Sequence, residues 1–250
     1  MSESEWMQRA PLVVGHRGAP RFAPENTLAG FRRSAELGAD GVELDAKLTA
    51  DGVVVCHHDR TLDRTTNGQG RVLDWTWESL RRLDAGSHFG AAFSGEPIPS
   101  LEQVLRELGD RLLFNVELTN YGSPRDRLPE AVLDLVGQFK LERRVLLSSF
   151  NTIALRRAAR LRPRLPLALL LRKDQGRLRR AVFPLIAPHE ALNMGDSLVT
   201  PEGVKRLLRR GKRVFVWTVN DPGRARHLLS LGVHGLITDV PDVVRRGIDE

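Results

Sequence analysis

The sequence predicts an α/β fold, a (β/α)8 TIM barrel that forms a single domain over residues 1–250. Short apolar runs alternate with longer amphipathic stretches along the chain, which is typical of proteins that alternate strands and helices. The length also matches that of an eight-fold barrel. Residues 49–99 break the alternation, because they are rich in turn residues and too long for an ordinary connection. We expect them to form a small insertion subdomain after the second strand, folded over one end of the barrel.

Eight apolar runs are the expected strands, and seven amphipathic stretches are the expected helices. The strands cover residues 12–16, 41–48, 112–117, 144–148, 167–171, 185–188, 213–218 and 235–237. The helices cover residues 26–38, 100–109, 127–140, 151–161, 174–182, 200–210 and 221–231. Helices are expected to begin after the capping residues Asn151, Thr200 and Asp221 and to end before Gly38, Gly211 and Gly232. The sixth unit has the weakest pattern, and a doubly wound sheet would show the same alternation.

The composition is that of a globular protein with a sizeable core, since 41% of the residues are hydrophobic and 28% are charged. The formal net charge of +7 comes mostly from arginine, and it would suit nucleic acid, an anionic membrane or an anionic substrate. Many arginines stand in pairs on helix-like faces, at positions 32–33, 156–157, 179–180 and 209–210. Aromatic residues make up only 6% of the chain and are not interleaved with them, so we expect no nucleic-acid partner.

Several features predict a cytoplasmic protein. Cys56 is the only cysteine, so no intrachain disulfide can form. Residues 1–10 lack the apolar stretch of a secretory signal, and no run approaches the ~20 apolar residues that span a bilayer. The sequence also shows no membrane-binding amphipathic helix. We therefore expect no stable membrane insertion.

Segment 41–48 alternates in a way that places two carboxylates on one face of a strand. The apolar side chains at positions 42, 44, 46 and 48 share one face, and Glu43, Asp45 and Lys47 share the other. In a barrel the apolar face packs on the helices, so Glu43 and Asp45 point inward. Two carboxylates this close need a compensating cation. These residues alone leave a metal ion and an internal ion pair, with Lys47 or with a neighbouring arginine, equally open.

A hairpin signal at Asp51-Gly52 brings a histidine toward these carboxylates. If these two residues form the turn, Asp45 lies opposite His58 on the returning strand. Directly opposed residues share a face. We therefore expect the side chain of His58 beside the carboxylates and that of His57 on the other face.

A third carboxylate, Glu117, ends the third strand with its side chain on the inward face. Active sites of such barrels lie at this C-terminal end of the strands. Three carboxylate ligands suit one Mg²⁺ or Ca²⁺ ion better than Zn²⁺, because no cysteine and too few histidines converge with them.

The segment Gly15-His16-Arg17-Gly18 also stands at the end of a strand. A lone histidine in such a position is more often structural than catalytic. Arg17 changes that balance, because a guanidinium can hold a phosphate through two parallel hydrogen bonds. Trp217 ends the seventh strand, where it could contact a substrate or simply belong to the core.

Further motifs join these residues in one order over nearly the whole chain. They are Gly15-His16-Arg17-Gly18, Pro24-Glu25-Asn26-Thr27, Glu43-Leu44-Asp45, His58-Asp59, Leu62-Asp63-Arg64-Thr65-Thr66-Asn67-Gly68, Asn115-Val116-Glu117, Trp217-Thr218-Val219-Asn220 and Gly235-Leu236-Ile237-Thr238-Asp239-Val240-Pro241. In this order they resemble the glycerophosphodiester phosphodiesterase family, whose fold is a (β/α)8 barrel with a small insertion after the second strand.

The resemblance implies a role for most of the candidate residues. Glu43, Asp45 and Glu117 would bind one divalent cation, Mg²⁺ or Ca²⁺, His16 and His58 would be the acid–base pair, Arg17 would hold the phosphate, and Glu25 and Asn26 would support the site. Many family members carry a lysine where this chain has Thr119. The missing lysine would remove positive charge near the phosphate or change the substrate preference.

The implied reaction is hydrolysis of a small-molecule glycerophosphodiester, such as glycerophosphocholine, to sn-glycerol 3-phosphate and an alcohol. The nearest rival is a lysophospholipase D-like phosphodiesterase that acts on lysophospholipids through the same site. A non-catalytic phosphate binder is disfavoured, because both histidines and all three carboxylates are present.

Overall fold

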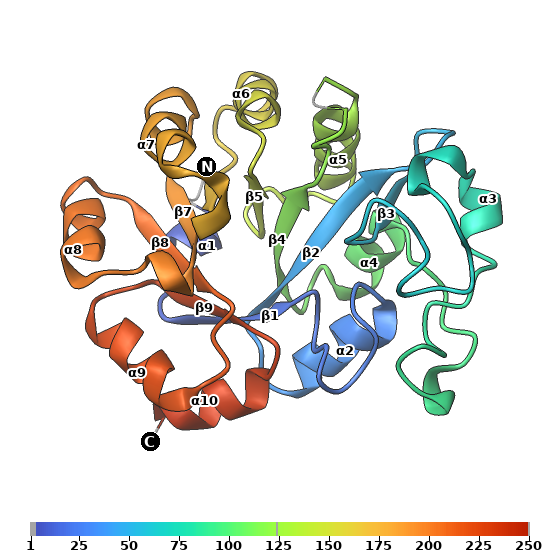
Figure 1. The fold of residues 1–250 in the computed structure, drawn as a ribbon, viewed down its shortest axis with the longest axis horizontal. Coiled ribbons are helices and arrows are strands. Elements are labelled where there is room, and N and C mark those ends of the chain that lie inside the picture. The colour runs from blue at the N-terminus through green and yellow to red at the C-terminus, as the bar shows by residue number, and fades with distance from the viewer. Residues whose placement is uncertain (1–3, 124, 250) are drawn as a thin grey trace.

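Eight parallel strands close into a barrel. The computed structural model describes residues 4–123 and 125–249. The strands are β1 (Leu12–His16), β2 (Gly41–Leu48), β4 (Leu113–Leu118), β5 (Val145–Ser149), β6 (Leu167–Leu171), β7 (Ala191–Gly195), β8 (Arg213–Trp217) and β9 (Gly235–Thr238). Pairing of β1 with both β2 and β9 closes the barrel, and helices surround it (Figure 1). This arrangement confirms the predicted (β/α)8 fold.

The helices follow the strands in sequence. They are α1 (Glu5–Gln8), α2 (Leu28–Glu36), α3 (Trp77–Leu80), α4 (Leu101–Leu108), α5 (Leu128–Gln138), α6 (Thr152–Leu161), α7 (Arg177–Ile186), α8 (Pro201–Arg209), α9 (Pro222–Ser230) and α10 (Pro241–Asp249), with short 3₁₀ turns at Val72–Asp74, Ala91–Phe93, Lys173–Gln175 and Asp196–Leu198. The side chains of Asn151, Thr200 and Asp221 accept hydrogen bonds from backbone N–H groups in the first turns of α6, α8 and α9. Because these bonds satisfy donors that a helix start leaves unpaired, the three predicted starts are confirmed.

The prediction of a strand at residues 185–188 is wrong. Residues 185 and 186 end α7, and the strand of this unit is β7 (Ala191–Gly195). The end of α7 is a continuous apolar run, whereas β7 contains Asn193 and Gly195, so the apolar signal points to the wrong segment. Helix α10 was not predicted either. No helix in the described part of the chain is long and apolar enough to cross a membrane.

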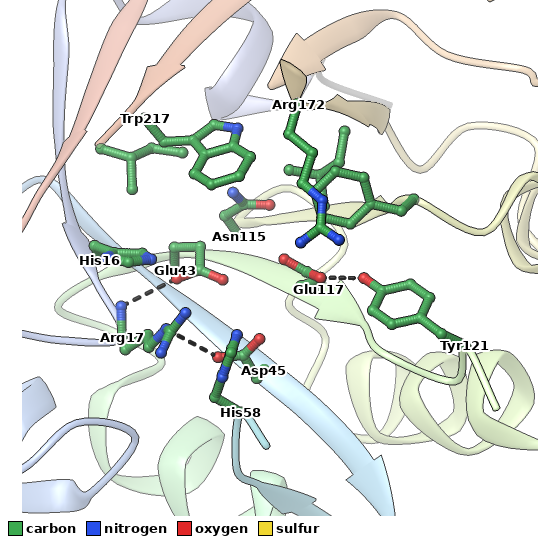
Figure 2. Close-up of a pocket in the computed structure, with 13 residues that line it drawn as sticks. His16, Arg17, Glu43, Asp45, His58, Asn115, Glu117, Tyr121, Arg172 and Trp217 are labelled. Atoms are coloured by element: carbon green, nitrogen blue, oxygen red, sulfur yellow. Dashed lines mark hydrogen bonds and ion pairs between the residues drawn. The ribbon is translucent and has the colours of Figure 1, made fainter. Parts of the chain in front are cut away.

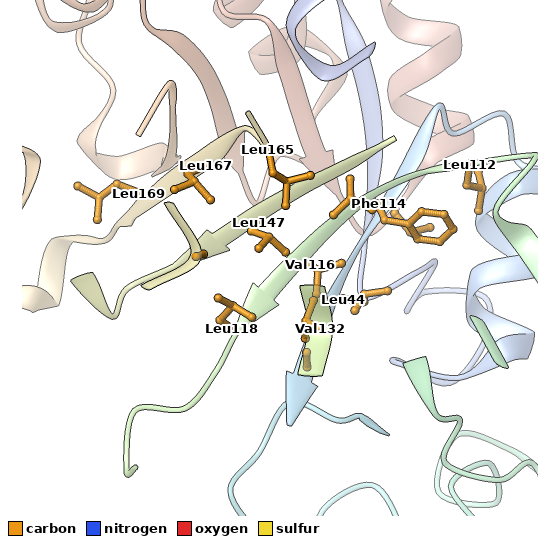
Figure 3. Packing of buried hydrophobic residues seen from close by; sticks show 14 of the residues in the cluster. Leu44, Leu112, Phe114, Val116, Leu118, Val132, Leu147, Leu165, Leu167 and Leu169 are labelled. Atoms are coloured by element: carbon orange, nitrogen blue, oxygen red, sulfur yellow. The ribbon is translucent and has the colours of Figure 1, made fainter. Parts of the chain in front are cut away.

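Alternating side chains divide the strands between two apolar cores. Leu44 of β2 and Val116 of β4 face outward and pack with Val132 of α5, as the alternation predicted (Figure 3). Inside the barrel, Trp6 of α1 packs edge-on against Phe215 with ring centroids 5.4 Å apart. Trp6 lies at the end where the strands begin, so the opposite end of the barrel remains for a site.

Residues 49–99 contain β3 (Val54–Cys56), which pairs antiparallel with β2, and the short helix α3. Six of their buried side chains form a small apolar cluster, Val55, Leu62, Val72, Leu80, Ala85 and Ile98, and Trp75 and Trp77 pack against it. The segment therefore has apolar contacts of its own beside the barrel.

The register of the hairpin between β2 and β3 differs by one residue from the predicted register. Leu48 pairs with Val54, so an odd number of residues separates them and the predicted two-residue turn is wrong. Gly52, with a φ of +82°, takes the left-handed conformation that a three-residue turn requires. The paired part of β3 ends at Cys56, and the backbone N–H of the next residue, His57, donates to the carbonyl oxygen of Asp45 at 2.9 Å.

Candidate active site

A cavity of about 280 Å³ opens at the end of the barrel where the strands finish. Its lining residues are His16, Arg17, Glu43, Asp45, His58, Asn115, Glu117, Tyr121, Phe150, Leu170, Arg172, Trp217 and Ile237. Figure 2 shows Tyr121 and Arg172 on the side of Glu117, and His16 and Arg17 on the side of Glu43. The side chains expected to act in catalysis, phosphate binding and metal binding therefore surround one cavity, together with Trp217.

Glu43 and Asp45 of β2 and Glu117 of β4 form an acidic cluster. Asp45 and Glu117 are in register on neighbouring strands, and ligand atoms of all three side chains lie within 4.8 Å of one another. Burial, with repulsion from Asp45 and Glu117, raises the pKa of Glu43 well above its usual value. Burial, with repulsion from Asp45, raises the pKa of Glu117 to about 8. A bound cation would relieve this repulsion, and a donor set made only of oxygen fits Mg²⁺ or Ca²⁺.

Arg17 lies beside the acidic cluster with a φ of +53°, an uncommon conformation for a residue other than glycine. Its backbone N–H donates to Glu43 at 3.0 Å, and its Nη1 donates to Glu25 at 3.0 Å. Its Nε lies 3.5 Å from an oxygen of Asp45 but is buried and forms no hydrogen bond with any described residue. Because an unsatisfied buried N–H is costly, Nε depends on this ion pair with Asp45 for its compensation.

Asn26 holds Asp45 in position from behind the cavity. The side-chain amide of Asn26 donates to Oδ2 of Asp45 at 2.8 Å, and its oxygen accepts from the backbone N–H of Asp45 at 3.1 Å. Asn26 is buried and has a φ of +54°, a left-handed conformation that asparagine tolerates better than most residues. Asn26 thus contacts a candidate metal ligand, whereas its neighbour Glu25 contacts Arg17.

His16 ends β1 and is oriented by residues whose role we did not predict. Its Nδ1 lies 2.8 Å from Oδ1 of Asp239, and Oδ2 of Asp239 accepts a hydrogen bond from the amide of Asn220 at 2.8 Å. The oxygen of Asn220 accepts in turn from the backbone N–H of Asp239 and the hydroxyl of Thr238. Burial opposes the charge on Asp239, but its hydrogen bond with His16 holds its pKa below the usual range. With Nδ1 engaged, Nε2 is the nitrogen of His16 that remains for chemistry.

His58 is oriented by residues of the 49–99 segment. Its Nδ1 lies 2.6 Å from Asp59, and Asp59 accepts a hydrogen bond from Nε of Arg64 at 2.5 Å. The same guanidinium donates to both carboxylate oxygens of Glu25, at 2.7 and 2.9 Å. Burial alone would raise the pKa of both carboxyl groups, but the hydrogen bonds from Arg64 outweigh this effect. The pKa of Glu25 and that of Asp59 are therefore lowered to about 2. A continuous chain of charged contacts therefore links His58 to Arg17.

The neighbouring His57 points away from the cavity. Its Nε2 lies 2.9 Å from the carbonyl oxygen of Thr61, and burial lowers its pKa. The expected side for each of the two histidines is correct, although the expected pairing of His58 with Asp45 is wrong. His58 reaches the cavity from the loop after β3 rather than from a paired strand position.

Aromatic side chains form another wall of the cavity. The rings of Tyr121 and Phe150, and those of Phe150 and Trp217, pack edge to face with centroids 5.9 and 6.0 Å apart. The hydroxyl of Tyr121 donates to Glu117, and the guanidinium of Arg172 lies 5.2 Å from the ring centroid of Phe150. Tyr121 and Arg172 were not predicted, because loop residues after strand ends carry no periodic signal. Their position directly after inward-facing strand ends is the only sequence feature that could have indicated them.

A second cavity, of about 570 Å³, shares His58, Tyr121 and Arg172 with the first. Lys47 lines it and donates from Nζ to the hydroxyl oxygen of Thr119 at 2.7 Å. An ammonium group therefore lies beside position 119, where the family resemblance leads us to expect a lysine. Among the described residues Lys47 forms no ion pair with the acidic cluster, whereas Nε of Arg17 lies 3.5 Å from Oδ2 of Asp45. Of the two internal ion pairs considered, only the one with a neighbouring arginine is therefore present among these residues.

A closed (β/α)8 barrel with an acidic cluster, two histidines and an arginine at the ends of its strands defines a barrel enzyme suited to phosphate esters. Comparison with known proteins is consistent with this class. Residues 16–243 match the Glycerophosphoryl diester phosphodiesterase family. The chain belongs to this family and is a phosphoric diester hydrolase.

Two similar enzymes and one solved structure match this chain along nearly their whole length. A glycerophosphodiester phosphodiesterase of Caldanaerobacter subterraneus subsp. tengcongensis is 39% identical over 249 residues, covering 94% of this chain and 98% of that protein. One of Bacillus altitudinis is 36% identical over 234 residues, covering 92% and 95%. The structure of an Oleispira antarctica phosphodiesterase in complex with the product sn-glycerol-3-phosphate aligns with a TM-score of 0.86 and 28% identity, covering 96% of this chain and 98% of that one.

Proposed function

We propose that this enzyme hydrolyses glycerophosphodiesters, such as glycerophosphocholine, to sn-glycerol 3-phosphate and an alcohol. The observation that carries the proposal is the convergence of Arg17, His16, His58 and the acidic cluster on one cavity. The names of the similar enzymes and the product bound to the Oleispira antarctica structure support it. Charged and polar side chains make up most of the residues that line the first cavity, which suits the phosphodiester group of such a substrate.

Glu43, Asp45 and Glu117 would hold one divalent cation, Mg²⁺ or Ca²⁺. When bound, the cation would polarise a phosphoryl oxygen and lower the pKa of a substrate hydroxyl. Arg17, which lines the cavity beside the acidic cluster, would hold another phosphate oxygen through its guanidinium. A fixed guanidinium also stabilises the negative charge that develops on the phosphate.

His16 and His58 would act as base and acid. Nε2 of His16 accepts the proton from the glycerol hydroxyl next to the phosphate, since Nδ1 is engaged by Asp239. The hydroxyl oxygen attacks phosphorus, the bond to the alcohol breaks, and the alcohol oxygen takes a proton from His58. Water then opens the resulting cyclic phosphate, with His58 accepting a proton and His16 returning one to the glycerol oxygen.

The position of His58 between the two cavities supports a proposal for where each half of the substrate would lie. The glycerol portion would lie near His16 with Trp217 as a wall, and the alcohol would extend past His58 into the second cavity. Lys47, beside Thr119, would supply positive charge at this boundary.

Alanine at either histidine tests the assignment. General acid–base groups typically contribute about 10²–10⁴-fold, so His16→Ala and His58→Ala should each lower kcat by about that factor with an unchanged thermal unfolding midpoint. His227→Ala is a matched control, because His227 is an exposed histidine on α9 that lines neither cavity. Retention of most of the activity in either site variant would contradict the assignment.

A further inference from the structure

Helix α7 exposes an apolar face to solvent. None of the residues of this helix is buried. Its largest apolar side chains are exposed, Leu178 by 77%, Val182 by 37%, Leu185 by 81% and Ile186 by 45%. The spacing of these four residues places them on one side of the helix. Phe183, on another side, packs against the barrel core, so the helix is attached to the protein with its apolar stripe facing outward.

Basic side chains border this stripe. Arg177 and Arg179 flank Leu178 in sequence, are exposed, and at helical spacing lie on either side of the apolar face. Arg180 turns back toward the protein and donates to the carbonyl oxygen of Lys173. An exposed apolar stripe with arginines at its borders is the pattern of a helix that lies in the interface of a membrane.

We propose that α7 docks this enzyme reversibly on an anionic lipid surface. The arginines complement anionic headgroups, and the apolar side chains would insert into the boundary between headgroups and acyl chains. This inference replaces the expectation that the chain has no membrane-binding amphipathic helix. It agrees with the expectation of no stable insertion, because a helix of this kind lies on the membrane and does not cross it.

The size of the face favours a lipid surface over a second copy of the chain. Helix α7 has 10 residues, which corresponds to a length of about 15 Å. One side of so short a helix offers far less than the ~800 Å² per partner of a stable protein interface. A lipid surface needs no matching partner surface, so a short stripe with flanking charge is sufficient for weak binding.

Docking through α7 would also place the active site near the lipid. Arg172 lines both cavities and stands just before the 3₁₀ turn Lys173–Gln175 that leads into α7. The cavity mouth and the docking helix are therefore close in the chain. An enzyme held in this way would meet diesters at the membrane surface.

The test is co-sedimentation of the full-length protein with vesicles of phosphatidylcholine alone or mixed with anionic phosphatidylglycerol. We expect binding to the anionic vesicles only, weakened by added salt. The double substitution Leu178→Ser/Leu185→Ser should lower the partition coefficient by roughly 10-fold or more. Arg177→Gln/Arg179→Gln should lower it by about 5-fold for each arginine.

Matched surface variants control for general changes in polarity and charge. Phe89→Ser removes another exposed apolar side chain, and Arg81→Gln/Arg82→Gln removes two exposed arginines that directly follow α3. Both controls should bind anionic vesicles like the unmodified protein. Absence of binding to anionic vesicles, or equal losses in control and α7 variants, would overturn the proposal. So would light scattering that shows a dimer dissociated by the double leucine substitution, since α7 would then be a self-association face.

Discussion

Replacing Asp239 by asparagine tests how the protein makes His16 a base. Asn220 donates its amide to Oδ2 of Asp239, while its oxygen is fixed by the N–H of residue 239 and by Thr238. An asparagine at position 239 must therefore direct its oxygen to Asn220 and its NH₂ toward Nδ1 of His16. Nδ1 then accepts a hydrogen bond, and the neutral imidazole carries its proton on Nε2. In that tautomer Nε2 cannot take the proton of the substrate hydroxyl.

The expected loss is that of a general base. Such a base contributes about 10²–10⁴-fold, so kcat should fall by that factor, equivalent to about 3–5 kcal/mol of transition-state stabilisation. Because Asp239→Asn keeps both hydrogen bonds, stability should change by no more than about 1 kcal/mol, or a Tm shift of about 2–4 °C.

The assay is the release of sn-glycerol 3-phosphate under saturating substrate and metal, with thermal unfolding measured on the same samples. Asp242→Asn is the matched control. The side chains of Asp239 and Asp242 are 20% and 19% exposed, and Asp242 pairs with Arg246 away from the cavity. An Asp239→Asn variant that keeps more than about a tenth of kcat, or a control that loses as much, would refute the reasoning.

Further predictions concern the metal, the insertion and acid stability. Mg²⁺ or Ca²⁺ at about 100 times its Kd should stabilise the protein by about 2.7 kcal/mol and raise Tm by about 5–10 °C in differential scanning fluorimetry, and Glu117→Gln should abolish that shift. Arg64→Ala should lower kcat by about 10–100-fold, comparable to loss of other outer-shell partners, with partial rescue by guanidinium salts. Arg32→Ala should not, because Arg32, whose side chain is 48% exposed against 49% for Arg64, pairs with Glu107 and lines neither cavity. Burial lowers the pKa of His234 from 6.5 to about 4. As the pH falls, the unfolded chain therefore binds a proton at His234 before the folded protein does. Unfolding midpoints in urea should therefore fall as the pH drops from about 6.5 toward 4, and less steeply in His234→Asn.

The parts of the site that lie on strands could be predicted from the sequence. Alternation fixes which side chains of a strand share a face, so the apolar residues of β2 determine that Glu43 and Asp45 point into the barrel. The same reasoning places Glu117 of β4 beside them. The closed barrel then brings His16 to the same rim, because parallel strands all finish at one end.

The parts of the site that depend on loops could not be predicted. Asp239 and Asn220 meet His16 only after the last strands close the barrel, and neither position shows a periodic pattern. The hairpin prediction failed by one residue, because Gly52 permits a three-residue turn as readily as Asp51-Gly52 suggests a two-residue turn.

Helix α7 marks another limit of sequence patterns. Its apolar stripe is visible in the sequence, but periodicity shows only that a helix has an apolar side, not whether that side meets the core or the solvent. The same apolar residues suggested a strand at 185–188. The exposure of Leu178 and Leu185 follows from the way Phe183 packs on the barrel, which is a tertiary contact.

Release of sn-glycerol 3-phosphate from glycerophosphocholine by the purified protein most directly tests metal-assisted hydrolysis at this site. The protein would be assayed as prepared, then with EDTA, and then with Mg²⁺ or Ca²⁺ restored in excess. Activity that EDTA abolishes and either cation restores is the predicted result. Full activity in EDTA would contradict the role of the acidic cluster, and no release under any of these conditions, from this or from the ethanolamine and glycerol diesters, would contradict the proposed function.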